Sequence, residues 1–524
     1  MIEFHDDVRT KFPSYLNDES GIVTSGSADR IYFPKNEREL VSVIKLAYDQ
    51  SIPYTISGGG TGLSGGRVPL EGWIIATDRM TSISDGDSQV WTDRETGAQY
   101  QLKLDIVSEK NAFLTVSIAM TIKAIQNYCR EVNWFYPPDP TERSCFIGGT
   151  VATNASGART FKFGPTRSWV QSIDVILPSG EYLRLDRAQD NGEITDTEIR
   201  IIVEGETFIV HKPNLTVPRV TKNVAGPILT KESHPMDLFI GSGGLLGTIA
   251  QVKLKLIRPP KSIFNIFVYC PTKTQLLQVV DACQGNRRTS SFPVPMSVES
   301  MDDRAAMIMR KKDPFIPSVA KYIIILEQDC HNEAELDHAL EYWANLFDGF
   351  GIEDTRVAQS YKEIEFHRSL RHSVPEQINA IVRGNGQAKF GTDCSLPETD
   401  FELLHDRATS LGDQFELFQN DRGPLGDQIG YAIWAHAGDA HIHLNLIPRD
   451  EAETQKAKEL FIEIMEFAVS HNGSIASEHG LGKKTFTGKP AIWYQYGDQG
   501  IDELRKMKLS LDPKNLLNRH NLIS

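Results

Sequence analysis

Three features that many proteins carry are missing from this sequence: a long apolar run, an excess of positive charge and closely paired cysteines. No stretch approaches the roughly 20 apolar residues of a membrane helix. The N-terminal MIEFHDDVRTKF has no apolar core, so we expect no secretory signal. The 55 basic and 69 acidic residues give a net charge of −14, which disfavours nucleic acid as a partner. The six cysteines are scattered without a Cys-x-x-Cys pair, which indicates reduced thiols rather than disulfides or a thiolate zinc site.

At 524 residues the chain is long enough for two or three domains. An amphipathic pattern after Asn36 predicts one helix, and a second such pattern predicts another helix over 122–132. From 169 to 210 the pattern changes to short strands. Turn residues at 178–180 and at 204–205 predict two hairpins there.

Arginine, two prolines and lysine at 258–261 indicate a domain boundary. Beyond it, helical patterns over 274–283 and 333–347 flank an apolar strand at 322–326. This arrangement predicts a second domain of the α+β class whose helices cover one face of its sheet. A long helix over 451–470 follows.

The most informative stretch is the glycine-rich loop SGGGTGLSGG at 57–66, directly after a predicted strand at 52–56. Closely spaced glycines let backbone N–H groups turn toward an anion such as a pyrophosphate. The loop lacks the Lys-Ser/Thr ending of a P-loop, and no helical run follows it as in the common dinucleotide-binding fold. Two more glycine-rich stretches, IGGTVATNASG at 147–157 and GSGGLLG at 241–247, favour a nucleotide site on a different scaffold over isolated tight turns.

A second group of chemistry-bearing residues lies in the stretch WAHAGDAHIHLN. His441, His443 and Asn445 alternate and therefore share one face of a strand, while His436 lies five residues before His441. The downstream Ser-Glu-His-Gly at 477–480 adds a carboxylate and another imidazole. Several histidines with one carboxylate suit a zinc-like divalent ion that keeps an open coordination position.

Taken together, these motifs resemble the FAD-linked oxidases of the PCMH type, in the vanillyl-alcohol-oxidase superfamily, and within them the D-2-hydroxy acid dehydrogenases. Four stretches carry the resemblance in the family's order: 53–66, 137–167, 241–249 and 511–518. The resemblance implies an α+β fold with a PCMH-type FAD-binding domain of two α/β subdomains and an α+β substrate (cap) domain with an antiparallel sheet. The implied bounds are 1–259 for the FAD-binding domain, 260–477 for the cap domain and 478–524 for a C-terminal segment that returns to the FAD-binding domain.

The resemblance implies FAD as the cofactor, with 57–66 around its pyrophosphate, 138–157 along the flavin and 241–247 near the adenosine. Relatives that attach FAD covalently often use a histidine in or near the first loop, and 57–66 contains none, so we expect non-covalent FAD. The chain departs from the family at Gly243, where Glu is usual, and at Arg519-His520, where Pro-Gly is usual. The residues implied to contact FAD are Ser57, Gly58, Gly59, Gly60, Thr61, Gly62, Leu63, Ser64, Gly65, Pro138, Asp139, Gly148, Gly149, Ala152, Thr153, Asn154, Gly157, Gly247 and Asn518.

The resemblance also assigns roles to the histidine-rich stretches. It implies that His436, His443 and Glu478 ligate a divalent metal, for which zinc is expected. It implies that His479 is the catalytic base, and the ordinary histidine pKa of about 6.5 suits that role.

A 2-hydroxy acid needs its carboxylate neutralised and oriented by a cation. Arg371 and Lys389 match the family's carboxylate-binding positions, and Asn445 is expected to hydrogen-bond the substrate hydroxyl. The family has Gly-Asn where this chain has Ala440-His441. His441 is therefore either a fourth ligand or a residue that faces away.

The expected reaction is oxidation of a D-2-hydroxy acid, D-lactate-like or D-2-hydroxyglutarate-like, to the 2-keto acid by metal-assisted hydride transfer to flavin N5. Expected partners are this small acid, an electron acceptor (quinone, cytochrome or electron-transferring flavoprotein) and a second copy in a homodimer, in the cytoplasm or at the periphery of a membrane. Three alternatives stay open: an alcohol or sugar oxidase of the same fold, a subunit that only transfers electrons within a complex, and a flavin-free zinc hydrolase built on His436, His443 and Glu478.

Overall fold

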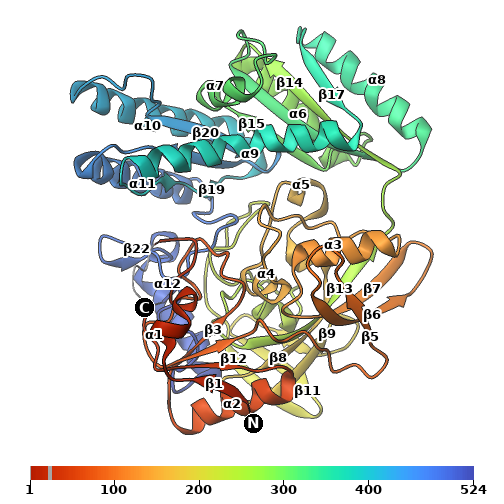
Figure 1. Cartoon of the computed structure of the whole chain (residues 1–524), viewed down its shortest axis with the longest axis vertical. Helices are drawn as coiled ribbons and strands as arrows, with labels where there is room; N and C mark the ends of the chain where they lie inside the picture. The colour runs from red at the N-terminus through yellow and green to blue at the C-terminus, as the bar shows by residue number, and fades with distance from the viewer. Residues whose placement is uncertain (1, 22–25, 524) are drawn as a thin grey trace.

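The computed structural model describes residues 2–21 and 26–523, which form two lobes (Figure 1). The lower lobe in this view holds the N-terminal half of the chain together with its last helix, and the upper lobe holds the part between them. One cluster of buried apolar side chains extends through both lobes. The lobes therefore share a core rather than meeting only at their surfaces.

The first sheet of the lower lobe contains the strand that leads into the glycine-rich loop. Its order is β1 (Glu3–His5), β2 (Arg30–Phe33), β4 (Trp73–Ala76) and β3 (Tyr54–Ser57). β2, β4 and β3 run parallel, so the chain crosses from β2 to β3 through a helix, α2 (Glu37–Asp49). The Asn36 side chain accepts a hydrogen bond from the Glu39 amide and caps α2, which confirms the predicted helix start.

A second sheet in this lobe is antiparallel throughout. Its order is β5 (Gln89–Thr92), β6 (Gln99–Ile106), β7 (Asn111–Ser117), β13 (Thr248–Ile257), β8 (Val170–Ile176) and β9 (Tyr182–Asp186). β8 and β9 form one predicted hairpin, and β11 (Glu198–Val203) with β12 (Glu206–His211) forms the other, beside β10 (Gly192–Ile194). The other helices of this region are α1 (Val8–Lys11), α3 (Ile122–Glu131), α4 (Ile147–Thr153) and α5 (Thr160–Phe163).

The upper lobe is built on an eight-stranded antiparallel sheet that begins just after the predicted boundary at 258–261. Its order is β17 (Thr355–Ala358), β14 (Ser262–Cys270), β16 (Tyr322–Cys330), β15 (Ser297–Met301), β20 (Tyr431–His436), β21 (His441–Leu446) and β18 (Phe390–Gly391), with β19 (Cys394–Ser395) also paired to β21. Its helices are α6 (Lys273–Thr289), α7 (Asp303–Lys312), α8 (Glu333–Gly349), α9 (Tyr361–Gly384), α10 (Phe401–Asp421) and α11 (Glu451–Ser470).

The expectation that helices cover one face of this sheet is wrong, because both faces are covered. Ile324 and Leu326 of β16 belong to the cluster that includes α6 and α8, whereas Ile323 and Ile325 belong to a second cluster with α7 and α9. An uninterrupted apolar run such as 322–326 is typical of a strand buried on both faces.

The chain ends in the lower lobe. α12 (Trp493–Leu511) follows a short hairpin of β22 (Thr485–Phe486) and β23 (Lys489–Pro490). After α12, the Tyr54 amide donates to the Leu516 carbonyl (2.9 Å), so the C-terminal residues lie against β3. All six cysteines are free, as predicted. Among the described residues, none of the helices is both long and apolar enough to span a bilayer.

Candidate active site

The first glycine-rich loop, 57–66, lies against the segment that follows His479. The Lys483 amide donates to the Ser64 carbonyl (2.8 Å), and the Lys483 ammonium donates to the carbonyls of Gly65 and Gly66. Gly482 has a φ of +47°, and a Cβ there would overlap the Ser64 carbonyl. Only glycine permits this close approach of the two backbones.

The backbone of this loop has unused hydrogen-bond donors. No amide from Gly58 to Gly66 donates to another residue in the described part of the chain. Gly60 has a φ of +82°, so the loop turns back through a left-handed conformation that favours glycine. A row of free amides at a turn is the donor set that a diphosphate requires, and the loop therefore fits the FAD pyrophosphate.

The other glycine-rich stretches lie beside this loop. The amides of Gly241 and Gly243 donate to the carbonyls of Val151 (3.1 Å) and Ala152 (2.8 Å), which joins 241–247 to α4. The Asn518 side chain accepts from the Ile56 amide (2.9 Å) and donates to the Gly244 carbonyl (2.7 Å). Asn518 thus connects the strand before the first loop to the third stretch.

Several residues predicted to contact FAD have side chains that bond within the protein. Asp139 accepts two hydrogen bonds from Arg143 (2.7 and 2.6 Å), and although burial opposes the charge, Arg159 and Arg143 lower the Asp139 pKa to about 2. The Asn154 side chain accepts from the Arg167 amide (3.0 Å). A Cβ on Gly148, Gly157 or Gly247 would contact Ile118, Asp139 or Val175, respectively, at 2.8 Å or less. Ser57, Gly58, Gly59, Gly60, Thr61, Gly62, Leu63, Ser64 and Gly65 form the loop, Gly149, Ala152 and Thr153 lie on α4, and Pro138 precedes Asp139.

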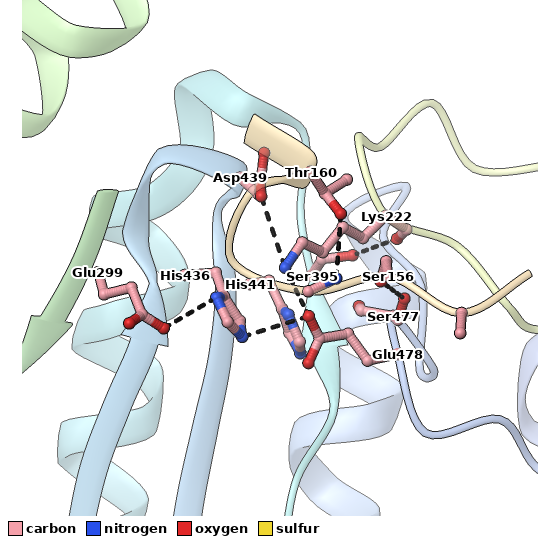
Figure 2. A network of polar contacts seen from close by, with 12 residues as sticks. Ser156, Thr160, Lys222, Glu299, Ser395, His436, Asp439, His441, Ser477 and Glu478 are labelled. Atoms are coloured by element: carbon pink, nitrogen blue, oxygen red, sulfur yellow. Dashed lines mark hydrogen bonds and ion pairs between the residues drawn. The ribbon is translucent and has the colours of Figure 1, made fainter. Parts of the chain in front are cut away.

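Four potential metal ligands meet where β20 ends and β21 begins. One ligand atom from each of His436, His441, His443 and Glu478 lies within 4.8 Å of all the others. His436 and His441 face each other in register across the two strands. Figure 2 shows Glu478 beside His436 and His441. The three predicted ligands are brought together, and His441 lies with them rather than facing away.

Each of these side chains has a polar partner on its far side. Glu299 lies 3.2 Å from His436 Nδ1, the Thr392 carbonyl lies 2.8 Å from His443 Nδ1, and Asp393 lies 2.9 Å from His441 Nε2. The buried Lys222 donates to Glu478 (2.6 Å), as Figure 2 shows. Such outer partners fix the orientation of metal-ligating side chains.

The charges of the cluster support an ionised Glu478. Burial opposes the charge, but His436 and Lys222 hold the Glu478 pKa well below its ordinary value. Burial likewise lowers the pKa of His443 well below its ordinary value. A carboxylate grouped with imidazoles is a donor set that fits a divalent cation.

Asp393 organises the loop that carries Glu478 and His479. Its carboxylate accepts hydrogen bonds from the amides of Ser477 (3.1 Å), Glu478 (3.1 Å) and His479 (2.8 Å). His479 Nδ1 lies 3.8 Å from Asp393, and its ring lies 5.2 Å from that of His443. The predicted base is therefore adjacent to the predicted metal ligands.

The predicted substrate-binding residues lie around the same cluster. Arg371 is paired with the buried Glu299 through Nη2 (2.8 Å) and Nε (3.2 Å). Lys389 lies 5.4 Å from the ring of Trp434, and no carboxylate in the described ranges lies within ion-pair distance of it. Burial lowers the Lys389 pKa to about 8. Asn445 donates to the His443 carbonyl (3.0 Å).

Sequence reasoning missed four residues of this region: Lys222, Glu299, Asp393 and Lys483. Two of them stand beside recognised motifs, since Asp393 follows Lys389 closely and Lys483 follows the Glu-His-Gly motif. Lys222 lies four residues before a Gly-Pro pair. Glu299 lies in an otherwise ordinary strand, and nothing in its neighbourhood marks it.

The chain matches two protein families, FAD binding domain at residues 28–186 and FAD linked oxidases, C-terminal domain, at residues 260–522. It is similar to D-2-hydroxyglutarate dehydrogenase of Xanthomonas citri, with 26% identity over 511 residues covering 93% of this chain and 88% of the relative. It is also similar to glycolate oxidase subunit GlcD of Bacillus subtilis (23% identity; 94% and 88% covered) and D-lactate dehydrogenase of Archaeoglobus fulgidus (23%; 93% and 89%).

A solved structure of alkyldihydroxyacetonephosphate synthase shares the fold, with a TM-score of 0.62 at 15% identity, covering 98% of this chain and 82% of that chain. The family match beginning at residue 260 agrees with the start of the eight-stranded sheet. The α+β fold and the resemblance noted in the sequence are confirmed. The chain belongs to the FAD-linked oxidases that carry a PCMH-type FAD-binding domain.

Proposed function

We propose that this protein is an FAD-dependent dehydrogenase that oxidises a D-2-hydroxy acid to the corresponding 2-keto acid, with a divalent metal ion at the histidine cluster. The family match supports FAD as the cofactor. The relatives named D-2-hydroxyglutarate dehydrogenase and D-lactate dehydrogenase support this substrate class.

The observation that carries the proposal is the position of the segment 477–483. At one end, Glu478 joins the histidine cluster and His479 stacks on His443. At the other end, Gly482 and Lys483 contact the glycine-rich loop. A substrate held at the cluster would therefore lie near a cofactor held by the loop.

Bound FAD would supply the two-electron oxidant for this reaction. The free amides of 58–66 would hold its pyrophosphate, and Lys483 and Asn518 would keep that loop in place. We infer that the attachment is non-covalent, because the loop contains no histidine.

A divalent ion, held by His436, His443 and Glu478, would lower the pKa of the substrate hydroxyl. His479 would then remove the hydroxyl proton as general base, with Asp393 beside its Nδ1 to stabilise the resulting imidazolium. Lys389 would bind the substrate carboxylate, because it is a half-buried cation that lies over Trp434 and has no ion-pair partner in the described residues. Arg371 would assist from its pair with Glu299, and Asn445 would orient the hydroxyl.

An anaerobic screen of D- and L-2-hydroxy acids, read from the loss of flavin absorbance, tests the proposal. We expect rapid bleaching by at least one D-acid, little by its L-enantiomer, and loss of the reaction after chelation that zinc restores. Bleaching by alcohols or sugars that a chelator leaves unchanged would indicate the oxidase alternative. A colourless protein that cleaves esters or amides would indicate the zinc hydrolase instead.

The electron acceptor (quinone, cytochrome or electron-transferring flavoprotein) and the compartment stay predictions. The six free thiols support a reducing compartment such as the cytoplasm. Reoxidation of the substrate-reduced flavin by each acceptor class, measured by stopped flow, identifies the acceptor.

A further inference from the structure

His441 is a buried imidazole that the proposed reaction does not use. It is 0% exposed at the start of β21, and its ring centroid lies 5.2 Å from that of His436 and 4.4 Å from that of His443. Its position opposite His436 is fixed by the pairing of β20 and β21. The ring is thus held inside the group that includes Glu478.

The hydrogen bond to Asp393 determines which ring nitrogen of His441 carries the proton. Asp393 already accepts from three backbone amides, at Ser477, Glu478 and His479, so it acts as an ionised acceptor. His441 Nε2, 2.9 Å away, must therefore donate. In a neutral imidazole this leaves Nδ1 with a bare lone pair.

This Nδ1 atom has no hydrogen-bond partner among the described residues, although it is buried. A buried polar atom without a partner is costly, and in a residue whose ligand atom lies within 4.8 Å of those of His436, His443 and Glu478 it indicates a missing ligand. In His443 the two ring nitrogens have the opposite roles. Its Nδ1 lies 2.8 Å from the Thr392 carbonyl, and its Nε2 faces Glu478. Glu299 lies beside His436 Nδ1, as Asp393 lies beside His441 Nε2.

We propose that His441 is a fourth protein ligand of the metal, through Nδ1, and that Asp393 is the residue that positions it. The inference rests on the metal centre of the proposed function and extends it from three protein ligands to three imidazoles and one carboxylate. Four protein ligands still allow substrate to add as a fifth, since zinc sites expand to five-coordinate during reaction. Because Asn is usual at this position in the family, we expect this chain to hold its ion more tightly than a three-ligand site.

The test uses the full-length, FAD-loaded protein after chelation, titrated with Zn²⁺ against a chromophoric chelator. His441→Asn removes the ligand, and His405→Asn is the matched control. His405 is another buried histidine whose Nδ1 has no hydrogen-bond partner in the described residues, but it lies on α10 between Tyr322 and Phe401. Losing an outer-shell partner typically weakens metal binding about 10–100-fold, and losing a ligand should weaken it at least as much. We expect this loss in H441N and wild-type affinity in H405N.

Zinc-edge X-ray absorption of the wild-type protein gives an independent reading that does not depend on a variant's folding. Three imidazoles in the scattering shell, falling to two in H441N, support the inference. Two imidazoles in the wild type, or unchanged zinc affinity in H441N, overturn it while leaving the three-ligand centre intact. If the wild-type protein binds no divalent ion, the result contradicts both the metal centre of the proposed function and its fourth ligand.

Discussion

Two cations beside the histidine cluster have partners of opposite charge, whereas Lys389 has none among the described residues. Arg371 is held by Glu299, and Lys222 by Glu478. The Lys389 ammonium lies 5.4 Å from the centre of the Trp434 ring, has no carboxylate within ion-pair distance among the residues that the structure describes, and has its pKa lowered by burial to about 8. A half-buried cation without a counter-charge is suited to bind an anionic ligand.

Replacing Lys389 should therefore affect substrate binding more than turnover. We expect Lys389→Met to raise KM for the hydroxy acid roughly 10–100-fold, because a hydrogen bond to a charged group is worth about 1.5–3 kcal/mol. Since the lysine loses its proton as pH rises through about 8, the wild-type KM should rise above that pH. Lys389→Arg should remove this rise. An unchanged KM in Lys389→Met would contradict the assignment.

Among the helices, α7 begins at the Asp302 carboxyl group, whose ionisation is opposed by burial. It caps α7 by accepting from the Ala305 amide (2.8 Å), and burial raises its pKa to about 7. A carboxyl group with a raised pKa in the folded state contributes stability at low pH that is lost as pH rises from about 4 through 7.

The variant Asp302→Asn keeps the cap and cannot ionise. We expect its melting temperature, relative to that of the wild type, to increase between pH 5 and pH 8, from a free-energy difference of at most roughly 4 kcal/mol. Thermal unfolding across this range measures the effect. A difference between the two proteins that does not change with pH would contradict the raised pKa.

Local sequence patterns predicted individual helices and hairpins well. They could not identify the site residues that contact each other from distant parts of the chain. α2 follows from its Asn36 cap and apolar period, and the hairpins follow from their turns. The sequence predicted the helices on one face of the upper sheet, but not the cover of the second face by α7 and α9, because an uninterrupted apolar run does not show which helices pack on each of its sides. Lys222 and Glu478 are 256 residues apart in sequence, so no local pattern could pair them.

At the scale of the whole molecule, a buried ion pair joins the two lobes. Arg159, 7% exposed, donates to both carboxylate oxygens of Glu327 on β16 (2.7 and 2.9 Å) and lies 3.5 Å from Asp139. Asp139 belongs to the stretch 138–157 that is implied to run along the flavin, and Arg159 follows this stretch by two residues. This ion pair therefore connects the lower lobe, which holds the glycine-rich loop, to the upper lobe, which carries the histidine cluster.

Breaking this pair should destabilise the fold through the charges left behind. We expect Arg159→Met to cost about 3–5 kcal/mol, read as a lower melting temperature, because Glu327 then lacks its partner. Adding Glu327→Gln should recover part of the loss. Arg200→Met, at an exposed pair with Glu198, serves as control and should change stability by no more than about 0.5 kcal/mol. Additive effects of the two lobe-interface substitutions would argue against coupling.

In the proposed reaction, the segment 477–483 delivers a general base to a substrate that lies between the histidine cluster and the flavin. The most direct test of this role is the rate of anaerobic flavin reduction by the preferred D-2-hydroxy acid in His479→Ala, measured by stopped flow. We predict that the variant keeps its flavin and its metal, while flavin reduction slows about 10²–10⁴-fold, the usual contribution of a general base. Reduction at nearly the wild-type rate in a flavin-loaded, metal-loaded His479→Ala protein would contradict this role.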